Sequence, residues 1–301
     1  MISLIGYKNI KKKSQKPIKD IALTTLILCM KVIDNYSEMS LWIKNNNKTI
    51  GFVPTMGALH DGHISLIIKA RLRSEKVIVS IFVNPKQFNS NNDFSSYPNT
   101  IENDLKKLKA NGVNIVYIPK SVTDIYDNEI PISVNVDNIA CIMEGKFRTG
   151  HFDGVLRVVN ILMCLIKPNY AFFGEKDYQQ LLIIKKLAST LDFECEIIGC
   201  PTVREESGLA MSSRNLLLSE QKKEDALIIQ KAFKYCIENF KSKDISQIQE
   251  NCIEILSTKS EVEYFEIRDE KTLMECKTNK CRAFAAIKIA NVRLIDNFLI
   301  T

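Results

Sequence analysis

The chain has 301 residues, 46% hydrophobic and 25% charged, which is typical of a globular protein with a sizeable core. The net charge of +6 is modest and much of the excess lies in residues 1–19, so we expect no nucleic-acid partner. No stretch is long and apolar enough to span a bilayer, so we expect no membrane partner. The 9 cysteines contain no C-x-x-C pair; we read them as reduced thiols of a cytoplasmic protein, without a disulfide framework or a zinc site.

The start of the chain loosely resembles a signal peptide, because lysine-rich residues precede a short apolar run, Ile21–Met30. That run contains Thr24 and Thr25, and no small-residue cleavage site follows it. We therefore expect residues 1–29 to be a disordered or spurious leader, with Met30 as the natural start. We also expect that removing the leader leaves activity intact.

From about residue 31 the hydrophobic pattern alternates between strand and helix periodicity. In chain order we predict a strand at Thr49–Val53, a helix at Gly62–Ser74, a strand at Val77–Val83, a helix at Thr100–Asn111, a strand at Asn114–Ile118, a helix at Asp153–Ile166, a strand at Tyr170–Phe173, a helix at Lys176–Thr190 and a strand at Phe193–Gly199. This alternation predicts an α/β fold with a parallel sheet, helices on both faces and ligands at the carboxyl ends of the strands.

After about residue 202 the pattern changes. In chain order we predict helices at Glu220–Phe240 and Ile245–Leu256, then strands at Glu261–Arg268, Arg282–Ile289 and Arg293–Asn297. The links between these strands are short, which indicates an antiparallel sheet. We therefore predict one parallel α/β domain over residues 30–202 and a smaller C-terminal α+β domain over residues 203–301.

The first segment with chemical potential is Pro54–His63, P-T-M-G-A-L-H-D-G-H, between a predicted strand and a predicted helix. Free amides at a helix start attract phosphate, and Gly57 and Gly62 let the backbone approach a nucleotide closely. At the positive helix end, His60 and His63 are expected to be mostly neutral donors to phosphate oxygens. The alternatives are a metal pair, which nearby cysteines do not complete, or surface histidines.

The second segment, Phe172–Gln180, also follows a strand and opens a helix, so we expect it at the same edge of the sheet. Lys176 can neutralise charge that develops in phosphoryl transfer. Asp177 is either a site residue or a helix N-cap, and Glu175 is either a site residue or a solvated charge.

The third segment, Met211–Asn215, lies in a polar loop after Gly208 and carries the donors Ser212, Ser213 and Arg214, which suit phosphates. Alone it is indistinguishable from a linker turn. No G-x-S-x-G motif occurs, so the chain does not read as a serine hydrolase.

A fourth set is mainly polar and lies in loops. Its members are Asn84, Gln87, Arg148, His151 and Gln180. Individually they are ordinary loop residues, and only the segments around them give them weight.

Together these segments resemble the pantoate–β-alanine ligase family. The matching motifs are P-T-M-G-A-L-H-x-G-H, V-N-P-x-Q-F, G-H-F-x-G-V, F-G-E-K-D-Y-Q-Q-L and P-T-V-R-E-x-x-G-L-A-M-S-S-R-N. The resemblance runs from about Met30 to Arg293–Asn297. H-x-G-H alone also occurs in other nucleotidyltransferases and class I aminoacyl-tRNA synthetases. A transferase of that group and a non-catalytic nucleotide-binding regulator are the alternatives.

The resemblance implies a Rossmann-like nucleotidyltransferase domain and a small C-terminal domain that closes over the site. It implies ATP-dependent condensation of pantoate with β-alanine through a pantoyl-adenylate, with release of AMP and pyrophosphate. It further implies a requirement for Mg²⁺ and a cytoplasmic homodimer.

The resemblance also implies roles for matching residues. His63 is implied as the proton donor, His60 and Lys176 as its catalytic partners, and Gln87 and Gln180 as the pantoate ligands. The implied ATP-binding residues are Met56, Gly57, Ala58, Leu59, His60, Asp61, Gly62, His63, Gly174, Glu175, Lys176, Asp177, Val203, Met211, Ser212, Ser213 and Arg214.

The remaining implied substrate residues are Asn84, Arg148 and His151. Asn99 stands where the family commonly has an arginine, so a local charge contact is in doubt. Asp104 is a candidate carboxylate that either supports the site from behind or is linked to Mg²⁺.

Overall fold

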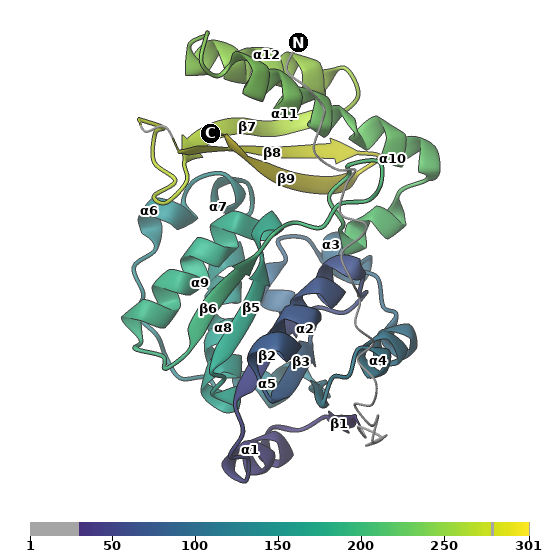
Figure 1. Cartoon of the computed structure of the whole chain (residues 1–301), viewed down its shortest axis with the longest axis vertical. Coiled ribbons are helices and arrows are strands. Elements are labelled where there is room, and N and C mark those ends of the chain that lie inside the picture. Colours follow the sequence, from purple (N-terminus) through teal and green to yellow (C-terminus); the bar gives the residue numbers. More distant parts are fainter. Residues whose placement is uncertain (1–29, 278–279, 301) are drawn as a thin grey trace, which may run out of the picture.

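A computed structural model of the chain describes residues 30–277 and 280–300 (Figure 1). The leader expected over residues 1–29 lies outside the described residues. The chain forms one six-stranded sheet and one three-stranded sheet. Within the described residues, no helix combines the length and apolar character that crossing a membrane requires.

The six-stranded sheet is parallel throughout, as predicted, and its strand order is β1-β4-β3-β2-β5-β6. Its strands are β1 Lys31–Ile33, β2 Ile50–Thr55, β3 Lys76–Ile81, β4 Ile115–Tyr117, β5 Tyr170–Gly174 and β6 Glu196–Cys200. The edge strand β1 was not predicted, because it has only three residues and two of them are exposed.

Helices cover both faces of this sheet, and the side chains of β2 alternate between two cores. Phe52 packs on the side of α8 and α9, whereas Val53 packs on the side of α2. The helices of this part are α1 Tyr36–Lys44, α2 Asp61–Arg73, α3 Asn91–Ser95, α4 Ile101–Ala110, α5 Val122–Tyr126, α6 Asp137–Ala140, α7 Glu144–Phe147, α8 His151–Ile166 and α9 Tyr178–Thr190. Three of the unpredicted helices, α5 to α7, have four or five residues, too few to show a helical period.

The C-terminal sheet is antiparallel in the order β7-β8-β9, as predicted. Its elements and the helices before them are α10 Glu220–Ala226, α11 Ile228–Asn239, α12 Ile245–Ser257, β7 Glu261–Asp269, β8 Cys281–Ile289 and β9 Val292–Ile300. The prediction of one helix over Glu220–Phe240 is wrong. The amide of Leu227 donates to the Glu224 carbonyl, and the Gln230 amide donates to the Leu227 carbonyl, so tight turns separate α10 from α11.

The three-stranded sheet lies across one end of the parallel sheet, with α11 and α12 on its other side (Figure 1). The contact is specific at β9, where the Asn297 side-chain amide donates to the carbonyls of Glu175 and Lys176 at 2.9 and 2.8 Å. An apolar cluster of Met143, Tyr264 and Phe284 joins the same two parts. The C-terminal part therefore touches the segment that follows β5.

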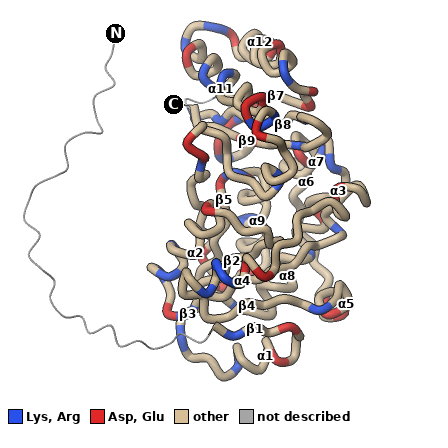
Figure 2. The backbone as a smooth tube through the Cα atoms, turned by 90° about the vertical axis from the view of Figure 1, so that its right-hand side faces the viewer, with Lys and Arg blue, Asp and Glu red and all other residues tan. Residues whose placement is uncertain are grey.

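The structure can be compared with the expectations about charge and about the cysteine thiols. Basic and acidic residues are interspersed along the described backbone (Figure 2). Cys276 and Cys281 form a disulfide with Cα atoms 5.9 Å apart, so the expectation of reduced thiols is wrong for this pair. The free thiols among the described residues are Cys141, Cys164, Cys195, Cys200, Cys236 and Cys252.

Candidate active site

The candidate site lies where the strand order of the parallel sheet reverses. The chain proceeds from β2 outward to β3 and β4, then returns to place β5 on the other side of β2. The loops after β2 and β5 therefore start side by side at the carboxyl edge of the sheet. Such a switch point is where open parallel sheets bind ligands.

The loop after β2 ends in a histidine pair at the start of α2. His60 is the N-cap, and its Nδ1 accepts a hydrogen bond from the Gly62 amide at 3.1 Å. His63 Nδ1 accepts in turn from the His60 amide at 3.3 Å. Two amides at the helix start, which we expected to donate to phosphate, therefore donate to the histidine rings instead. The remaining ring donors are the two Nε2–H groups, with ring centroids 4.1 Å apart.

Both histidines are held in the neutral form. Burial, together with the nearby Lys176 and Lys107, lowers the pKa of His60 to about 4. Burial, then His60 and the same two lysines, hold the pKa of His63 well below its usual range. Each ring is therefore a neutral Nε2–H donor at neutral pH, as the sequence predicted.

Glycine is required in this loop for two different reasons. Gly57 has φ +81°, in the left-handed region that favours glycine. At Gly62 a Cβ atom would lie 2.8 Å from the His60 ring, so a side chain there would displace the capping histidine. The absence of a side chain at Gly62 therefore leaves room for the His60 ring as well as for a nucleotide.

Asp104 supports the loop from behind. Its carboxylate is buried and accepts from the amides of Ala58 and Leu59, both at 2.8 Å. Thr100, at the N-cap position of α4, donates its hydroxyl to the same carboxylate at 3.1 Å. Lys107, one turn along α4, donates to the Leu59 carbonyl. Helix α4 therefore fixes the loop that carries the histidines.

The loop after β5 forms the 3₁₀ turn η2, Glu175–Asp177, with Lys176 at its centre. Asp177 occupies the N-cap position of α9 but makes no side-chain cap hydrogen bond. Gln180 points to the cavity, whereas its neighbour Gln179 is buried and holds the carbonyls of Ile139 and Ile142.

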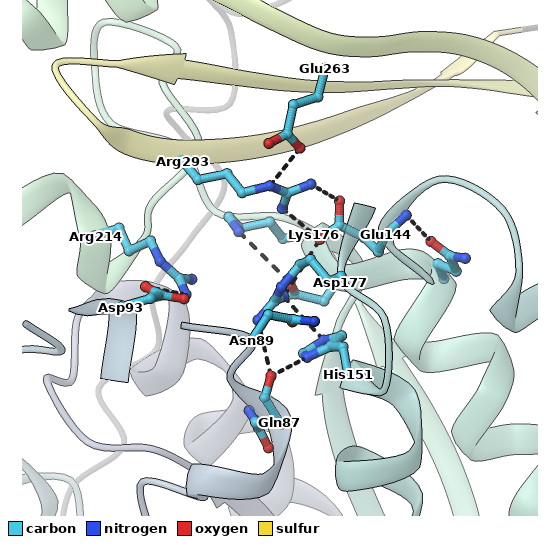
Figure 3. A network of polar contacts seen from close by, with 12 residues as sticks. Gln87, Asn89, Asp93, Glu144, His151, Lys176, Asp177, Arg214, Glu263 and Arg293 are labelled. Carbon is cyan, nitrogen blue, oxygen red and sulfur yellow. Dashed lines mark hydrogen bonds and ion pairs between the residues drawn. The ribbon is translucent and has the colours of Figure 1, made fainter. Parts of the chain in front are cut away.

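The third segment closes the site from the C-terminal side. Ser213 donates to the Ala58 carbonyl at 3.0 Å, which ties this segment to the histidine loop. Arg214 forms an ion pair with Asp93 at 3.0 Å (Figure 3). Arg214 also lies over the ring of Tyr97. Arg214 is therefore held at the cavity wall by a carboxylate in this structure.

Four members of the fourth set, Asn84, Gln87, Arg148 and His151, form a connected floor of the cavity, and Figure 3 shows the contact between Gln87 and His151. His151 Nδ1–H donates to the Gln87 carbonyl at 2.7 Å, and Arg148 donates to the same carbonyl at 3.3 Å. Arg148 also donates to His151 Nε2 at 3.1 Å. Asn84 is buried and donates to the Gln87 side-chain oxygen at 3.2 Å.

One open cavity collects most of the predicted residues. Those that line it are Met56, His60, Gly62, His63, Asn84, Gln87, Arg148, His151, Gly174, Lys176, Asp177, Gln180, Val203, Met211, Ser212, Ser213 and Arg214. Gly57, Ala58, Leu59, Asp61, Glu175 and Asp104 were also predicted but are not among its lining residues.

The prediction omitted the apolar wall of the cavity, formed by Val155, Val158, Val159 and Leu162 of α8. Their i, i+3, i+4, i+7 spacing was visible in the sequence, but it reads equally well as ordinary core packing. Tyr97 also lines the cavity, and burial raises its pKa.

The donor set does not form a metal site made by the protein. Within residues 30–277 and 280–300, no group of three or more His, Cys, Asp or Glu side chains is placed to hold a metal ion. Both oxygens of Asp104 already accept hydrogen bonds from the protein. Asp104 therefore supports the loop from behind, and it is not among the residues that line the cavity.

Proteins of similar sequence support the same interpretation of the site. The family model described as pantoate-beta-alanine ligase matches residues 31–299. Pantothenate synthetase from Flavobacterium psychrophilum is 40% identical over 278 residues, which cover 89% of this chain and 99% of that protein. The enzyme from Thermodesulfovibrio yellowstonii is 42% identical over 269 residues, 87% of this chain and 96% of the relative.

Solved structures give the same result. Pantothenate synthetase from Thermus thermophilus superposes with a TM-score of 0.82 at 34% identity, covering 89% of this chain and 99% of that one. Pantoate-beta-alanine ligase from Francisella tularensis, complexed with beta-gamma ATP and β-alanine, gives 0.76 at 40% identity, covering 90% and 97%. The chain belongs to the pantoate–β-alanine ligase family.

Proposed function

We propose that the cavity performs both halves of the family reaction, the ATP-dependent condensation of pantoate with β-alanine to pantothenate. A pantoate carboxylate oxygen attacks the α-phosphorus of ATP, and pyrophosphate leaves. The β-alanine amine then attacks the acyl carbon of the pantoyl-adenylate and loses a proton, and AMP leaves. The observation that carries the proposal is the convergence of phosphate donors and of amide side chains on one cavity.

The phosphate side of the cavity is assigned to hydrogen-bond donors that are either neutral or positively charged. His63 Nε2–H is assigned as the catalytic donor to the phosphates, with His60 beside it and Lys176 facing both. The neutral rings support this role, because they donate without adding charge that would hold the product. Ser212, Ser213, Arg214 and the loop Met56–Leu59 complete the ATP side.

The acid side is assigned to Gln87 and Gln180, with Asn84, Arg148 and His151 supporting Gln87. A neutral amide orients a carboxylate without occupying, as a bidentate arginine would, the lone pairs that attack phosphorus. The apolar wall of α8 suits the two methyl groups of pantoate. The contacts of Arg148 and His151 with the Gln87 carbonyl support a role in positioning Gln87.

Three further assignments rest on the family. We propose a boundary near residue 202, with the C-terminal part closing over the site. We assign Mg²⁺ to the nucleotide, with no protein ligand. We also propose a homodimer in the cytoplasm.

Pantoate-dependent exchange of pyrophosphate into ATP tests the first half, and AMP release on addition of β-alanine tests the second. A nucleotide transferred permanently to the acceptor would indicate another H-x-G-H transferase. Absence of turnover would indicate a nucleotide-binding regulator.

His63→Ala and Lys176→Ala test the residue assignments. Each should lower the exchange rate by about 10²-fold or more, as the loss of a charge-stabilising donor does elsewhere. Near-normal exchange in either folded variant would remove that residue from the catalytic set. Lys234→Ala, on the exposed face of α11, serves as a control and should keep the normal rate.

A further inference from the structure

Tyr126 lies behind the acid side of the cavity, at the end of α5, and is not among the lining residues. Its hydroxyl lies 2.8 Å from Asn84 Oδ1. Asn84 is only 1% exposed, so its polar atoms depend on partners from the protein. The contact places a hydroxyl directly behind a residue that touches Gln87.

The backbone fixes which way the Asn84 amide points. The Lys86 amide, which can only donate, lies 3.2 Å from Oδ1. The Gly154 carbonyl, which can only accept, lies 3.1 Å from Nδ2. Oδ1 is therefore the acceptor on the Tyr126 side, and the Tyr126 hydroxyl is the donor.

The direction of this chain of hydrogen bonds continues to Gln87. Asn84 Nδ2 donates to Gln87 Oε1 at 3.2 Å, so the oxygen of the Gln87 amide is the atom that faces Asn84. Gln87 Nε2 then faces Met56 Sδ, 3.0 Å away, at the cavity wall. A carboxylate can only accept hydrogen bonds, so the orientation that exposes Nε2–H is the one that binds an acid.

Burial keeps the Tyr126 hydroxyl a donor, although two cations lie over its ring. Lys86 Nζ lies 3.7 Å from the ring centroid and Arg157 Cζ lies 5.2 Å from it. Arg157 is itself held by the Glu129 carboxylate. Burial raises the pKa of Tyr126 to about 12, so the hydroxyl stays protonated at neutral pH.

We propose that Tyr126 is a positioning residue for the acid substrate: through Asn84, its hydroxyl holds the Gln87 amide with its N–H groups toward the pantoate carboxylate. The inference rests on the proposed function, in which Gln87 binds pantoate. It assigns a part in substrate recognition to a residue that does not touch the substrate.

Tyr126→Phe removes the hydroxyl and keeps the ring that contacts Lys86 and Arg157. The KM for pantoate should rise about fivefold, the loss expected from one hydrogen bond, while the KM for ATP stays within about twofold. Tyr117→Phe is the matched control, because Tyr117 is buried in β4 and its hydroxyl has no hydrogen-bond partner within the described structure. That variant should leave both KM values unchanged.

Gln87→Ala separates failure of this inference from failure of the proposed function. If Gln87→Ala leaves the KM for pantoate unchanged, the assignment of Gln87 is wrong and the inference falls with it. If Gln87→Ala raises that KM but Tyr126→Phe behaves like Tyr117→Phe, the role of Tyr126 alone is overturned. In the Gln87→Ala background, Tyr126→Phe should have no further effect on the KM; a second rise of about fivefold would show that Tyr126 acts by another route.

Discussion

The neighbours of the three histidines hold two of them in one tautomer and the third in the other. His60 and His63 accept at Nδ1 and so carry the proton on Nε2. His151 donates from Nδ1 to a carbonyl and accepts at Nε2 from Arg148. Nitrogen-15 NMR of the imidazoles should therefore show two Nε2–H rings and one Nδ1–H ring. A protonated ring at pH 7, or three identical tautomers, would contradict the arrangement.

The same histidines make stability depend on pH. Burial lowers the pKa of His60 and His151 to about 4 from an ordinary value of 6.5. The unfolded chain then binds more protons than the folded chain between these values. The histidine contribution should be complete above about pH 6.5 and decline as the pH falls toward 4. Urea unfolding of the normal protein and of His151→Gln across this range measures it, and the variant should show the smaller decline.

Sequence motifs predicted the place of residues whose position depends on their neighbours in the chain. The histidine pair and Lys176 each follow a strand and open a helical turn, so their place could be inferred from neighbours in the chain. Asn297 could not be placed in this way, because its contacts to Glu175 and Lys176 join positions more than a hundred residues apart. Its role depends on tertiary packing alone.

At the scale of elements, α4 holds the loop after β2 through the Asp104 carboxylate and through Lys107. Asp104→Ala would leave the Ala58 and Leu59 amides without their acceptor in a buried site. We expect the free energy of unfolding to fall by about 3 kcal/mol and the KM for ATP to rise. Urea unfolding and initial rates measure the two effects. Asp127→Ala, at the exposed C-terminal end of α5, should change neither. An unchanged KM with lowered stability would limit Asp104 to a structural role.

A second connection between elements runs from β9 to η2. Asn297→Ala removes both hydrogen bonds to the turn that carries Lys176, so we expect kcat to fall about tenfold. In a Lys176→Ala background the same change should have little further effect, because both act on one group. Asn160→Ala, which removes a buried amide of α8, should leave kcat unchanged. Equal losses in both backgrounds would show that Asn297 acts independently of Lys176.

The regular elements were the predictable part of the fold. Strands β2, β3 and β5 and helices α2, α8 and α9 have strong apolar patterns, and their predicted bounds agree with the structure within a few residues. Short helices such as α7 carry no period, yet α7 supplies Glu144. The break between α10 and α11 leaves the apolar period uninterrupted, so only the backbone hydrogen bonds reveal it.

At the scale of the molecule, a buried ion pair joins β9 of the C-terminal sheet to helix α7 (Figure 3). Arg293 of β9 donates to both oxygens of Glu144 at 2.6 and 2.7 Å, and the Tyr264 hydroxyl donates to the same carboxylate at 2.7 Å. Arg148 lies 3.6 Å from Glu144, which connects the pair to the floor around Gln87. No sequence pattern indicated this pairing, because Glu144 and Arg293 lie in separate predicted domains.

For this ion pair we predict that a double variant, with both residues replaced, is more stable than the single variant Arg293→Met. Arg293→Met removes the hydrogen-bonded partner of the buried Glu144 carboxylate, which keeps only the more distant Arg148 and the Tyr264 hydroxyl, and it also removes the contact of Arg293 with Glu263. The free energy of unfolding should fall by about 3–5 kcal/mol. Glu144→Gln combined with Arg293→Met removes the charge as well and should recover a large part of that loss. Urea unfolding measures both, with Lys234→Met of the exposed pair Lys234–Glu238 as a control expected to change stability by about 0.5 kcal/mol or less.

The pH dependence of the same variants checks the cause. Burial raises the pKa of Glu144, but the hydrogen bonds and the charge interaction with Arg293 outweigh burial and lower this pKa to about 2 from 4.5. Its contribution should be complete above about pH 4.5 and be lost as the pH falls toward 2. Arg293→Met should therefore lose its stability deficit relative to the normal protein as the pH falls through this range. A deficit that stays constant down to about pH 2 would mean that the loss comes from packing of the Arg293 side chain rather than from the unpaired charge of Glu144.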